Sequence, residues 1–278
     1  MDMINYGGAC FIFERGYTMF AFNLTVIILL GLIMGSFTNV MIYRIPEKVS
    51  LWSPPSTCKN CKTQIKWYDN IPVISYLILG GKCRNCDERI SIQYPLVEAV
   101  CGILFAVIFL VHGISLDFLF TAVISVVLVA ISVIDLRSMT IPNGLVISLI
   151  VISSLYTTCR FIFPGLFSGT ITWFDPLIGF VAASLPLLLI AVITKGGMGG
   201  GDIKLMAAAG IFLGWKGILV ALLVGSLIGA VVSSVLMLMG KKNRKDMIPF
   251  GPFLCLGILF AALFANPIIE WYARLLTF

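Results

Sequence analysis

Four of the eight cysteines occur in two pairs whose spacing suits a metal site. Each pair has the form C-x-x-C, and residues 62–82 separate Cys58 and Cys61 from Cys83 and Cys86. Two thiolates on one tight turn can bind the same Zn²⁺, and a second such turn completes a tetrahedral site with Zn–S distances of about 2.3 Å. Four thiolates leave no ligand position for water, so the pattern predicts structural zinc. The alternative interpretation is a redox-active dithiol pair.

Three acidic residues lie in or beside long apolar segments, where an ionisable side chain is costly and is often functional. They are Glu98, Asp135, which follows an apolar run, and Asp202, which follows the glycines at 199–201. Two carboxylates that share one water are sufficient for aspartic proteolysis. The ionised carboxylate takes a proton from the water, and the protonated one donates to the scissile carbonyl. Asp135 and Asp202 are therefore candidates for such a pair.

Structural roles for the same residues are also open. Asp135 could cap the fourth predicted span (142–163) or pair with Arg137, and Asp202 could be a helix N-cap, a position that Asp favours. The glycine run before Asp202 could be a flexible linker. It matches neither G-x-G-x-x-G nor a Walker A loop, so the sequence gives little support for nucleotide binding.

The composition indicates what must position these groups. The 278 residues are 59% hydrophobic and 12% charged, whereas soluble domains have about 25% charged residues. We therefore predict an all-α polytopic membrane protein with about eight transmembrane helices. A small zinc-bound cytoplasmic loop domain would lie between the first two. The expected spans are residues 20–43, 94–113, 117–135, 142–163, 175–194, 203–215, 217–239 and 249–272.

The spans divide the chain into four expected regions. These are an N-terminal segment (1–19), the first transmembrane helix (20–43), the four-cysteine loop domain (44–93) and a seven-helix membrane domain that carries the aspartates (94–278). The apolar stretch 71–81 is too short to cross a membrane, so it is interpreted as an interfacial or buried segment of the loop.

Basic residues set the expected orientation. Most of the 19 Lys and Arg residues fall in the segments 44–93, 136–141, 195–202 and 240–248. Because cytoplasmic loops collect Lys and Arg, these segments and both candidate sites are expected to face the cytoplasm, with both termini outside. This bias also accounts for the net charge of +6 without a nucleic-acid partner.

An ordered set of motifs resembles the bacterial type IV prepilin leader peptidases over about residues 30–255. The set begins with the run GSFTNVMIYRIP at residues 35–46 and continues with the two C-x-x-C pairs and YPLVE at residues 94–98. It ends with Asp135-Leu136-Arg137, Ile141-Pro142 and G-x-G-D-x-K at residues 199–204. G-x-G-D alone is a weak signal, but the ordered set is highly specific.

The resemblance implies a bifunctional enzyme of the bacterial inner membrane. Such an enzyme cleaves the basic leader from prepilins or pseudopilins, whose apolar helix lies in the bilayer, and methylates the new N-terminus with S-adenosylmethionine. By motif match, the catalytic residues would be Asp135 and Asp202, and the zinc ligands would be Cys58, Cys61, Cys83 and Cys86. A supporting loop would contain Gly199, Gly201 and Lys204. Methyl transfer would involve Gly35, Asn39, Arg44, Pro46 and Glu98.

One position departs from the pattern of many relatives, which have Pro-Asp where this chain has Pro142-Asn143. Activity is expected to survive this change, because that second acid is not catalytic in the family, and Asn143 is expected to cap the following helix.

Three other functions remain as alternatives. A transporter or channel could use Glu98, Asp135 and Asp202 as a proton path, although these acids are expected at one membrane face. A membrane thiol oxidoreductase could use the C-x-x-C pairs. A non-catalytic assembly subunit would need neither site.

Overall fold

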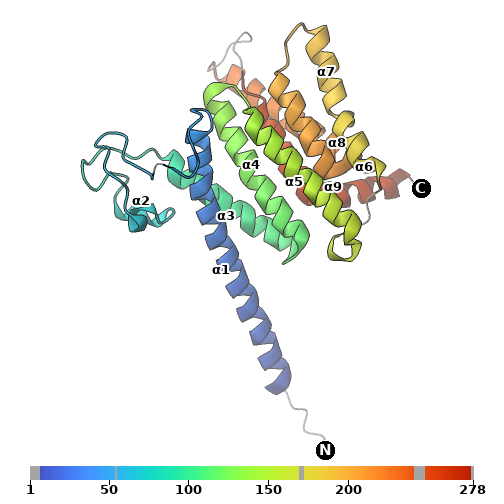
Figure 1. Cartoon of the computed structure of the whole chain (residues 1–278). Coiled ribbons are helices and arrows are strands. Elements are labelled where there is room, and N and C mark those ends of the chain that lie inside the picture. The colour runs from blue at the N-terminus through green and yellow to red at the C-terminus, as the bar shows by residue number, and fades with distance from the viewer. Residues whose placement is uncertain (1–6, 54, 169–171, 241–247, 277–278) are drawn as a thin grey trace, which may run out of the picture. The chain divides into compact units, whose positions relative to one another are not determined.

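The computed structural model describes residues 7–53, 55–168, 172–240 and 248–276, and these residues are predominantly helical (Figure 1). Within them, β pairing is limited to two isolated bridges. The elements are α1 (Gly7–Arg44), the 3-10 helix η1 (Trp67–Asn70), α2 (Ile74–Ile78), α3 (Gln93–His112), α4 (Leu116–Ser138), α5 (Asn143–Ile162), η2 (Pro164–Leu166), α6 (Phe174–Ala182), α7 (Ser184–Ile193), α8 (Gly200–Leu238) and α9 (Gly251–Leu276).

Among the described residues, seven helices are long and apolar enough to cross a membrane. The predicted all-α polytopic membrane fold is therefore confirmed, and one of the seven helices, α8, combines two of the eight predicted spans. This helix has 39 residues and joins the predicted spans 203–215 and 217–239. The interruption falls at Gly214, where φ is 68° and ψ is 176°. This conformation is essentially confined to glycine, so Gly214 divides α8 into two halves.

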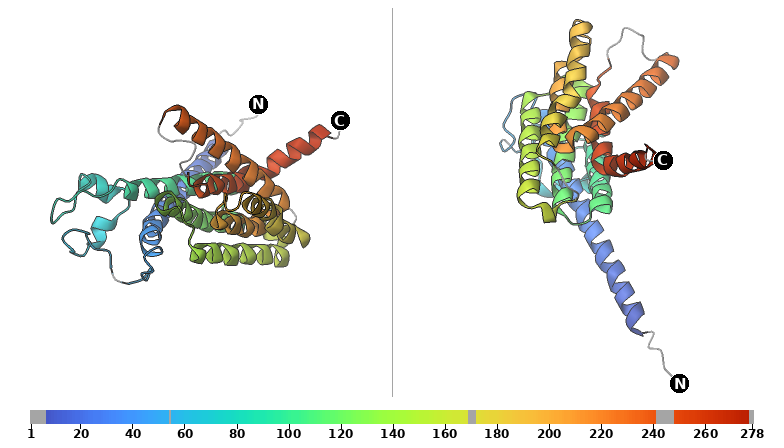
Figure 2. Two further views of the ribbon diagram at one scale, coloured as in Figure 1. Left: turned by 90° about the horizontal axis from the view of Figure 1, so that it is seen from above. Right: turned by 90° about the vertical axis from the view of Figure 1, so that its right-hand side faces the viewer.

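The two halves of α8 run in opposite directions (Figure 2). The first half begins at Gly200, and its first turn lies beside the end of α4. The second half packs antiparallel to α9, since Gly257 approaches Ala221 and Gly225 approaches Leu254. Because α9 itself begins beside α4, the second half of α8 returns toward the end of α4 at which the first half begins. The chain reversal expected between the two predicted spans is thus present, and it lies at Gly214.

The predicted span 175–194 is also interrupted. It contains α6 and α7, which meet at Ala183 and together form one candidate span of 20 residues. Pro186 lies three residues after this junction and has no N–H to continue the helical hydrogen bonds. The break therefore follows from the sequence.

Contacts divide the chain into two compact units, residues 1–37 with 55–113 and residues 38–54 with 114–278. In the first unit, α1 and α3 approach closely. A Cβ atom on Gly35 would lie only 2.5 Å from the Glu98 Cα atom. Small residues permit such contact between membrane helices.

The second unit contains α4 to α9. Its most buried candidate span is α4, in which 67% of the apolar window is buried inside the protein. This helix is the scaffold for one of the predicted catalytic residues.

Candidate active site and metal centre

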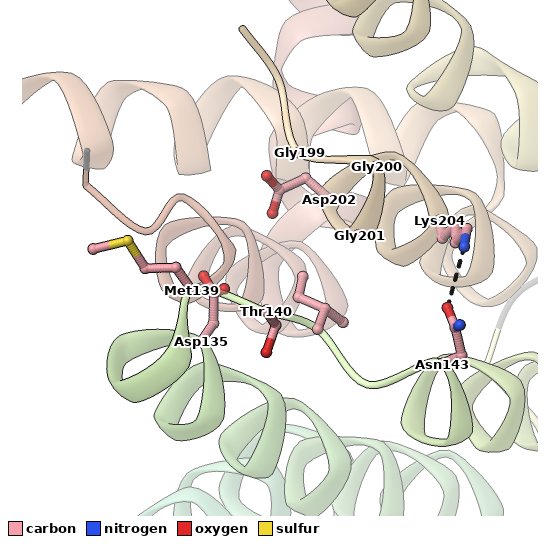
Figure 3. A pocket seen from close by; sticks show the side chains of 10 residues that line it. Asp135, Met139, Thr140, Asn143, Gly199, Gly200, Gly201, Asp202 and Lys204 are labelled. Atoms are coloured by element: carbon pink, nitrogen blue, oxygen red, sulfur yellow. Dashed lines mark hydrogen bonds between the residues drawn. The ribbon is translucent and has the colours of Figure 1, made fainter. Parts of the chain in front are cut away.

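A pocket of about 320 Å³ in the second unit contains both predicted catalytic aspartates (Figure 3). One wall comes from the end of α4 and the link to α5: Asp135, Met139, Thr140, Ile141 and Asn143. The other wall comes from the start of α8: Gly199, Gly200, Gly201, Asp202 and Lys204. The structure thus brings together residues from two distant parts of the sequence.

Asp135 lies in the last turn of α4, and its side chain is only 5% exposed. The helix ends just beyond it because Met139 adopts a left-handed conformation, with φ at 52°, while its N–H donates to the Asp135 carbonyl at 2.8 Å. The Oδ2 atom of Asp135 accepts a hydrogen bond from the backbone N–H of Gly251 at 3.1 Å. The carboxylate is therefore held at a fixed position by the first residue of α9.

Asp202 lies in the first turn of α8 and is 8% exposed. The N-cap position belongs to Gly199, so the alternative in which Asp202 is the N-cap is wrong. Two of the glycines before Asp202 lie so close to neighbouring side chains that a Cβ atom would clash. A Cβ atom on Gly199 would lie 2.9 Å from Asp202 Oδ2, and one on Gly201 would lie 2.9 Å from the Ile141 Cβ atom.

Two neighbouring polar residues bind partners other than those considered in the sequence analysis. Arg137 donates to the Tyr43 hydroxyl at 2.9 Å and lies over its ring, rather than forming an ion pair with Asp135. Asn143 does not cap α5, whose N-cap is Pro142 without a side-chain bond. Asn143 instead accepts a hydrogen bond from Lys204 Nζ at 3.1 Å, which joins the two walls of the pocket.

The pocket has the minimal requirements for acid–base hydrolysis. Two carboxyl groups that line one pocket and are largely shielded from solvent cannot both be ionised cheaply, which favours a state in which one of them is protonated. The Gly251 N–H bond favours the charged form of Asp135, because a donor stabilises a carboxylate. This hydrogen bond therefore makes Asp135 the more easily ionised of the two carboxyl groups.

Gly251 was not singled out from the sequence. A Cβ atom there would lie 2.6 Å from Asp135 Oδ2, so any side chain at this position would displace the Asp135 carboxyl group. The only sequence signal is a glycine between Phe250 and Pro252 at the start of an apolar span.

In the first unit, the four predicted zinc ligands form one cluster. Their sulfur atoms all lie within 4.8 Å of one another. The Sγ atoms of Cys58 and Cys86 are 3.8 Å apart, and those of Cys61 and Cys83 are 4.0 Å apart. A tetrahedral site with Zn–S bonds of about 2.3 Å requires S···S distances of about 3.8 Å. The cluster therefore fits zinc.

The two C-x-x-C segments are two copies of the same turn. The Cys58 N–H donates to the Thr63 carbonyl at 2.9 Å, and the Cys83 N–H donates to the Glu88 carbonyl at 2.8 Å. Each turn is closed by an isolated β bridge, between Thr57 and Gln64 in the first and between Lys82 and Arg89 in the second. This local duplication was not recognised in the sequence.

Hydrogen bonds around the sulfurs favour metal-binding thiolates. The side chain and backbone of Thr63 lower the pKa of the Cys61 thiol to about 6, and the backbone N–H groups of Asn85 and Cys86 lower the pKa of Cys83. The neighbouring cysteines and burial nevertheless raise the pKa of Cys86 to about 11, despite a backbone hydrogen bond at Glu88. A divalent cation would offset this repulsion and hold all four thiolates.

The residues expected to serve methyl transfer have several different environments. Asn39 is buried in α1, and Pro46 is exposed in the turn that follows it. Arg44 donates to the carbonyls of Ser50 and Leu51 at 2.9 and 3.2 Å.

Glu98, also in this group, is buried and accepts a hydrogen bond from the Val73 N–H at 2.8 Å. The contact between Gly35 and the Glu98 backbone leaves no space between these two residues for S-adenosylmethionine.

Comparisons with known proteins agree with the two-part organisation. A model of the bacterial peptidase A24 N-terminal domain matches residues 29–112, and a model of the type IV leader peptidase family matches residues 122–234. The chain is 36% identical over 253 residues to the prepilin leader peptidase/N-methyltransferase of Bacillus subtilis strain 168, covering 91% of this chain and 98% of that protein.

Two further relatives have the same description. The Legionella pneumophila protein is 32% identical over 275 residues, with 90% of this chain and 94% of that protein covered. The Pseudomonas putida protein is 32% identical over 293 residues, with coverage of 93% and 96%. No solved structure matches the chain at a significant level.

Proposed function

The chain belongs to the type IV leader peptidase family, and we propose that it cleaves the leader from prepilins or pseudopilins and methylates the N-terminus that cleavage exposes. The observation that carries the peptidase assignment is the placement of Asp135 and Asp202 in one pocket. The relatives' names supply the substrate class and the second activity.

In the proposed cleavage, ionised Asp135 removes a proton from a water molecule as the water attacks the scissile carbonyl. Protonated Asp202 donates its proton to the carbonyl oxygen, giving a neutral tetrahedral intermediate. Collapse of this intermediate breaks the C–N bond, the departing amine takes the proton held by Asp135, and the hydroxyl proton returns to Asp202. The carboxyl pair therefore ends the cycle as it began.

The substrate chemistry supports this assignment. A prepilin has a basic leader in water followed by an apolar helix in the bilayer, so its cleavage site lies where the two meet. Asp135 and Asp202 lie at the ends of apolar helices, the same position relative to a bilayer. The excess of basic residues in the segments at this end supports a cytoplasmic orientation of the site.

Methyl transfer is proposed to use residues other than the aspartate pair. When bound, S-adenosylmethionine supplies the methyl group. Family resemblance assigns this step to the region containing Gly35, Asn39, Arg44, Pro46 and Glu98. Within that group, Gly35 is proposed to position α1 against α3, which it contacts closely. Glu98 is proposed to position the cysteine loop, because it accepts the hydrogen bond from Val73.

Co-expression with a prepilin tests the proposal. Mass spectrometry of the pilin should show leader loss and the added mass of one methyl group with the unaltered enzyme. Asp135→Asn and Asp202→Asn should each abolish leader loss, whereas Asp175→Asn, which changes an acid outside the pocket, should not. Zinc content and thermal melting would establish that each variant is folded. Near-normal processing by a folded Asp135→Asn or Asp202→Asn protein would refute the catalytic pair.

A further inference from the structure

The loop that holds the four cysteines has an exposed apolar surface on and beside α2. We define this α2 apolar surface as Ile71, Ile74, Leu77 and Ile78, whose exposed fractions are 39%, 49%, 71% and 74%. The sequence analysis interpreted segment 71–81 as interfacial or buried, and these exposures exclude the buried alternative. Contiguous exposed apolar side chains usually mark a surface that is covered by a partner or a membrane.

A hydrogen bond fixes this segment near one end of a membrane helix. The Val73 N–H, immediately before α2, donates to Glu98 Oε2 at 2.8 Å. Glu98 lies in the second turn of α3, about 8 Å from the start of that helix at 1.5 Å per residue. The 20 residues of α3 span about 30 Å, the thickness of the hydrocarbon core. Val73 is therefore held in the outer part of the hydrocarbon core, close to its boundary with the headgroups.

The conformation of Val73 indicates that this attachment is specific. Its φ of 60° and ψ of −49° are unusual for any residue with a side chain and are more so for a β-branched one. Such a conformation persists only where surrounding contacts hold it. The buried Glu98 carboxylate provides one such contact, and it does so on the residue that precedes the apolar turn.

The charge of the surrounding loop complements anionic lipid headgroups. The described residues 55–92 contain more basic than acidic side chains, and Lys59, Lys62, Lys66, Lys82 and Arg89 are all exposed. Basic residues beside membrane helices gain attraction to the anionic cytoplasmic leaflet. Apolar side chains that insert at the boundary, surrounded by Lys and Arg, are typical of interfacial segments.

We propose that the α2 apolar surface inserts into the interfacial region of the bilayer and docks the four-cysteine loop on the membrane. The occupant of this surface is lipid, because the attachment to Glu98 holds the surface at membrane depth. The inference rests on α3 spanning the membrane and is independent of the proposed peptidase and methyltransferase activities.

Photo-cross-linking of the full chain tests the proposal. A diazirine analogue of leucine would be placed at position 77 or 78, with position 64 as a control in the same loop, because Gln64 is exposed and polar. The protein would be reconstituted in nanodiscs of phosphatidylcholine and phosphatidylglycerol. Mass spectrometry of the adducts after irradiation should show several-fold more lipid adduct at positions 77 and 78 than at position 64.

Zinc content would show that the loop is folded in each labelled protein. Lipid adducts no more abundant at position 77 than at position 64, or adducts mainly to a second copy of the chain, would overturn the proposal. The attachment step has its own test. Glu98→Ala should lower the lipid adduct at position 77 several-fold, and an unchanged yield would show that Glu98 does not hold the surface at the membrane.

Discussion

At the residue level, the chemistry of a buried carboxylate depends on the donors that face its oxygens. Glu98 accepts the Val73 N–H, and Asp117 accepts bonds from the Tyr156 hydroxyl and the Ser168 N–H. Asp135 accepts the Gly251 N–H and also faces a pocket. The first two carboxylates therefore fix structure, whereas Asp135 is both held in place and accessible to a substrate.

Gly251→Ala is predicted to impair cleavage without unfolding the protein. The added Cβ atom would lie 2.6 Å from Asp135 Oδ2 and would displace the carboxylate that the Gly251 N–H now holds. We expect kcat for prepilin cleavage to fall by about 10²-fold, the effect of removing one aligned donor from an active site, with little change in KM.

Gly144→Ala is the matched control, because no atom lies near the Cβ position of Gly144 and the residue is outside the pocket. It should cleave at the normal rate. A Gly251→Ala enzyme with normal kcat would show that this contact does not position Asp135.

At the level of elements, the cysteine loop should hold its metal in a pH-dependent way. A lowered pKa in the folded loop means that folding favours the Cys61 thiolate. The contribution of this thiolate to the stability of the fold is complete above the ordinary cysteine pKa of 9.0, and it is lost as the pH falls through about 6. Because protons compete with zinc for the thiolates, we expect acidification to release zinc, as measured with a colorimetric chelator on the purified protein.

Cys61→Ser should lower zinc content already at neutral pH, whereas Cys159→Ser, which changes a cysteine outside the cluster, should not. Full zinc occupancy in Cys61→Ser would contradict the four-thiolate site, and an unaltered protein that contains no zinc while its thiols are intact would favour the redox interpretation.

Several features of the elements could be predicted from the sequence. Hydropathy located the spans because each needs an apolar run about 20 residues long, and C-x-x-C spacing located the zinc cluster because it brings two ligands onto one turn. The motifs also placed Asp135 and Asp202 correctly in one pocket.

Other features depend on contacts that no local pattern encodes. The Gly251 N–H meets Asp135 across 116 residues of sequence. The reversal was predicted between residues 215 and 217, but the structure places it at Gly214, whose backbone conformation is essentially confined to glycine. The exposure of α2 could not be derived from its apolar residues, which fit a buried segment equally well.

At the scale of the molecule, α4 carries a buried aspartate at each end: one lines the candidate active site and the other takes part in structural hydrogen bonds. Asp135 lies in its last turn, and Asp117 lies in its first, about 27 Å away along the axis. Asp117 is 4% exposed, and its two partners come from α5 and from the segment after η2. Arg160 completes this cluster by donating to the Tyr156 hydroxyl and to the Ser168 carbonyl. Asp117 could not be singled out from the sequence, because it only begins a predicted span and has no motif around it.

Asp117→Asn is predicted to destabilise the protein and leave its chemistry intact. The carboxylate accepts from two donors, whereas an amide has one acceptor oxygen and would direct its NH₂ group at the other donor. The free energy of unfolding should fall by about 2 kcal/mol, as expected when a buried charged hydrogen bond is lost. Thermal melting in detergent should detect the change, and Tyr156→Phe should act in the same direction, non-additively with it. Well below the melting temperature, cleavage of a prepilin should proceed at the normal rate, because Asp135 lies at the far end of α4. Loss of cleavage with unchanged melting would instead assign Asp117 to the catalytic machinery.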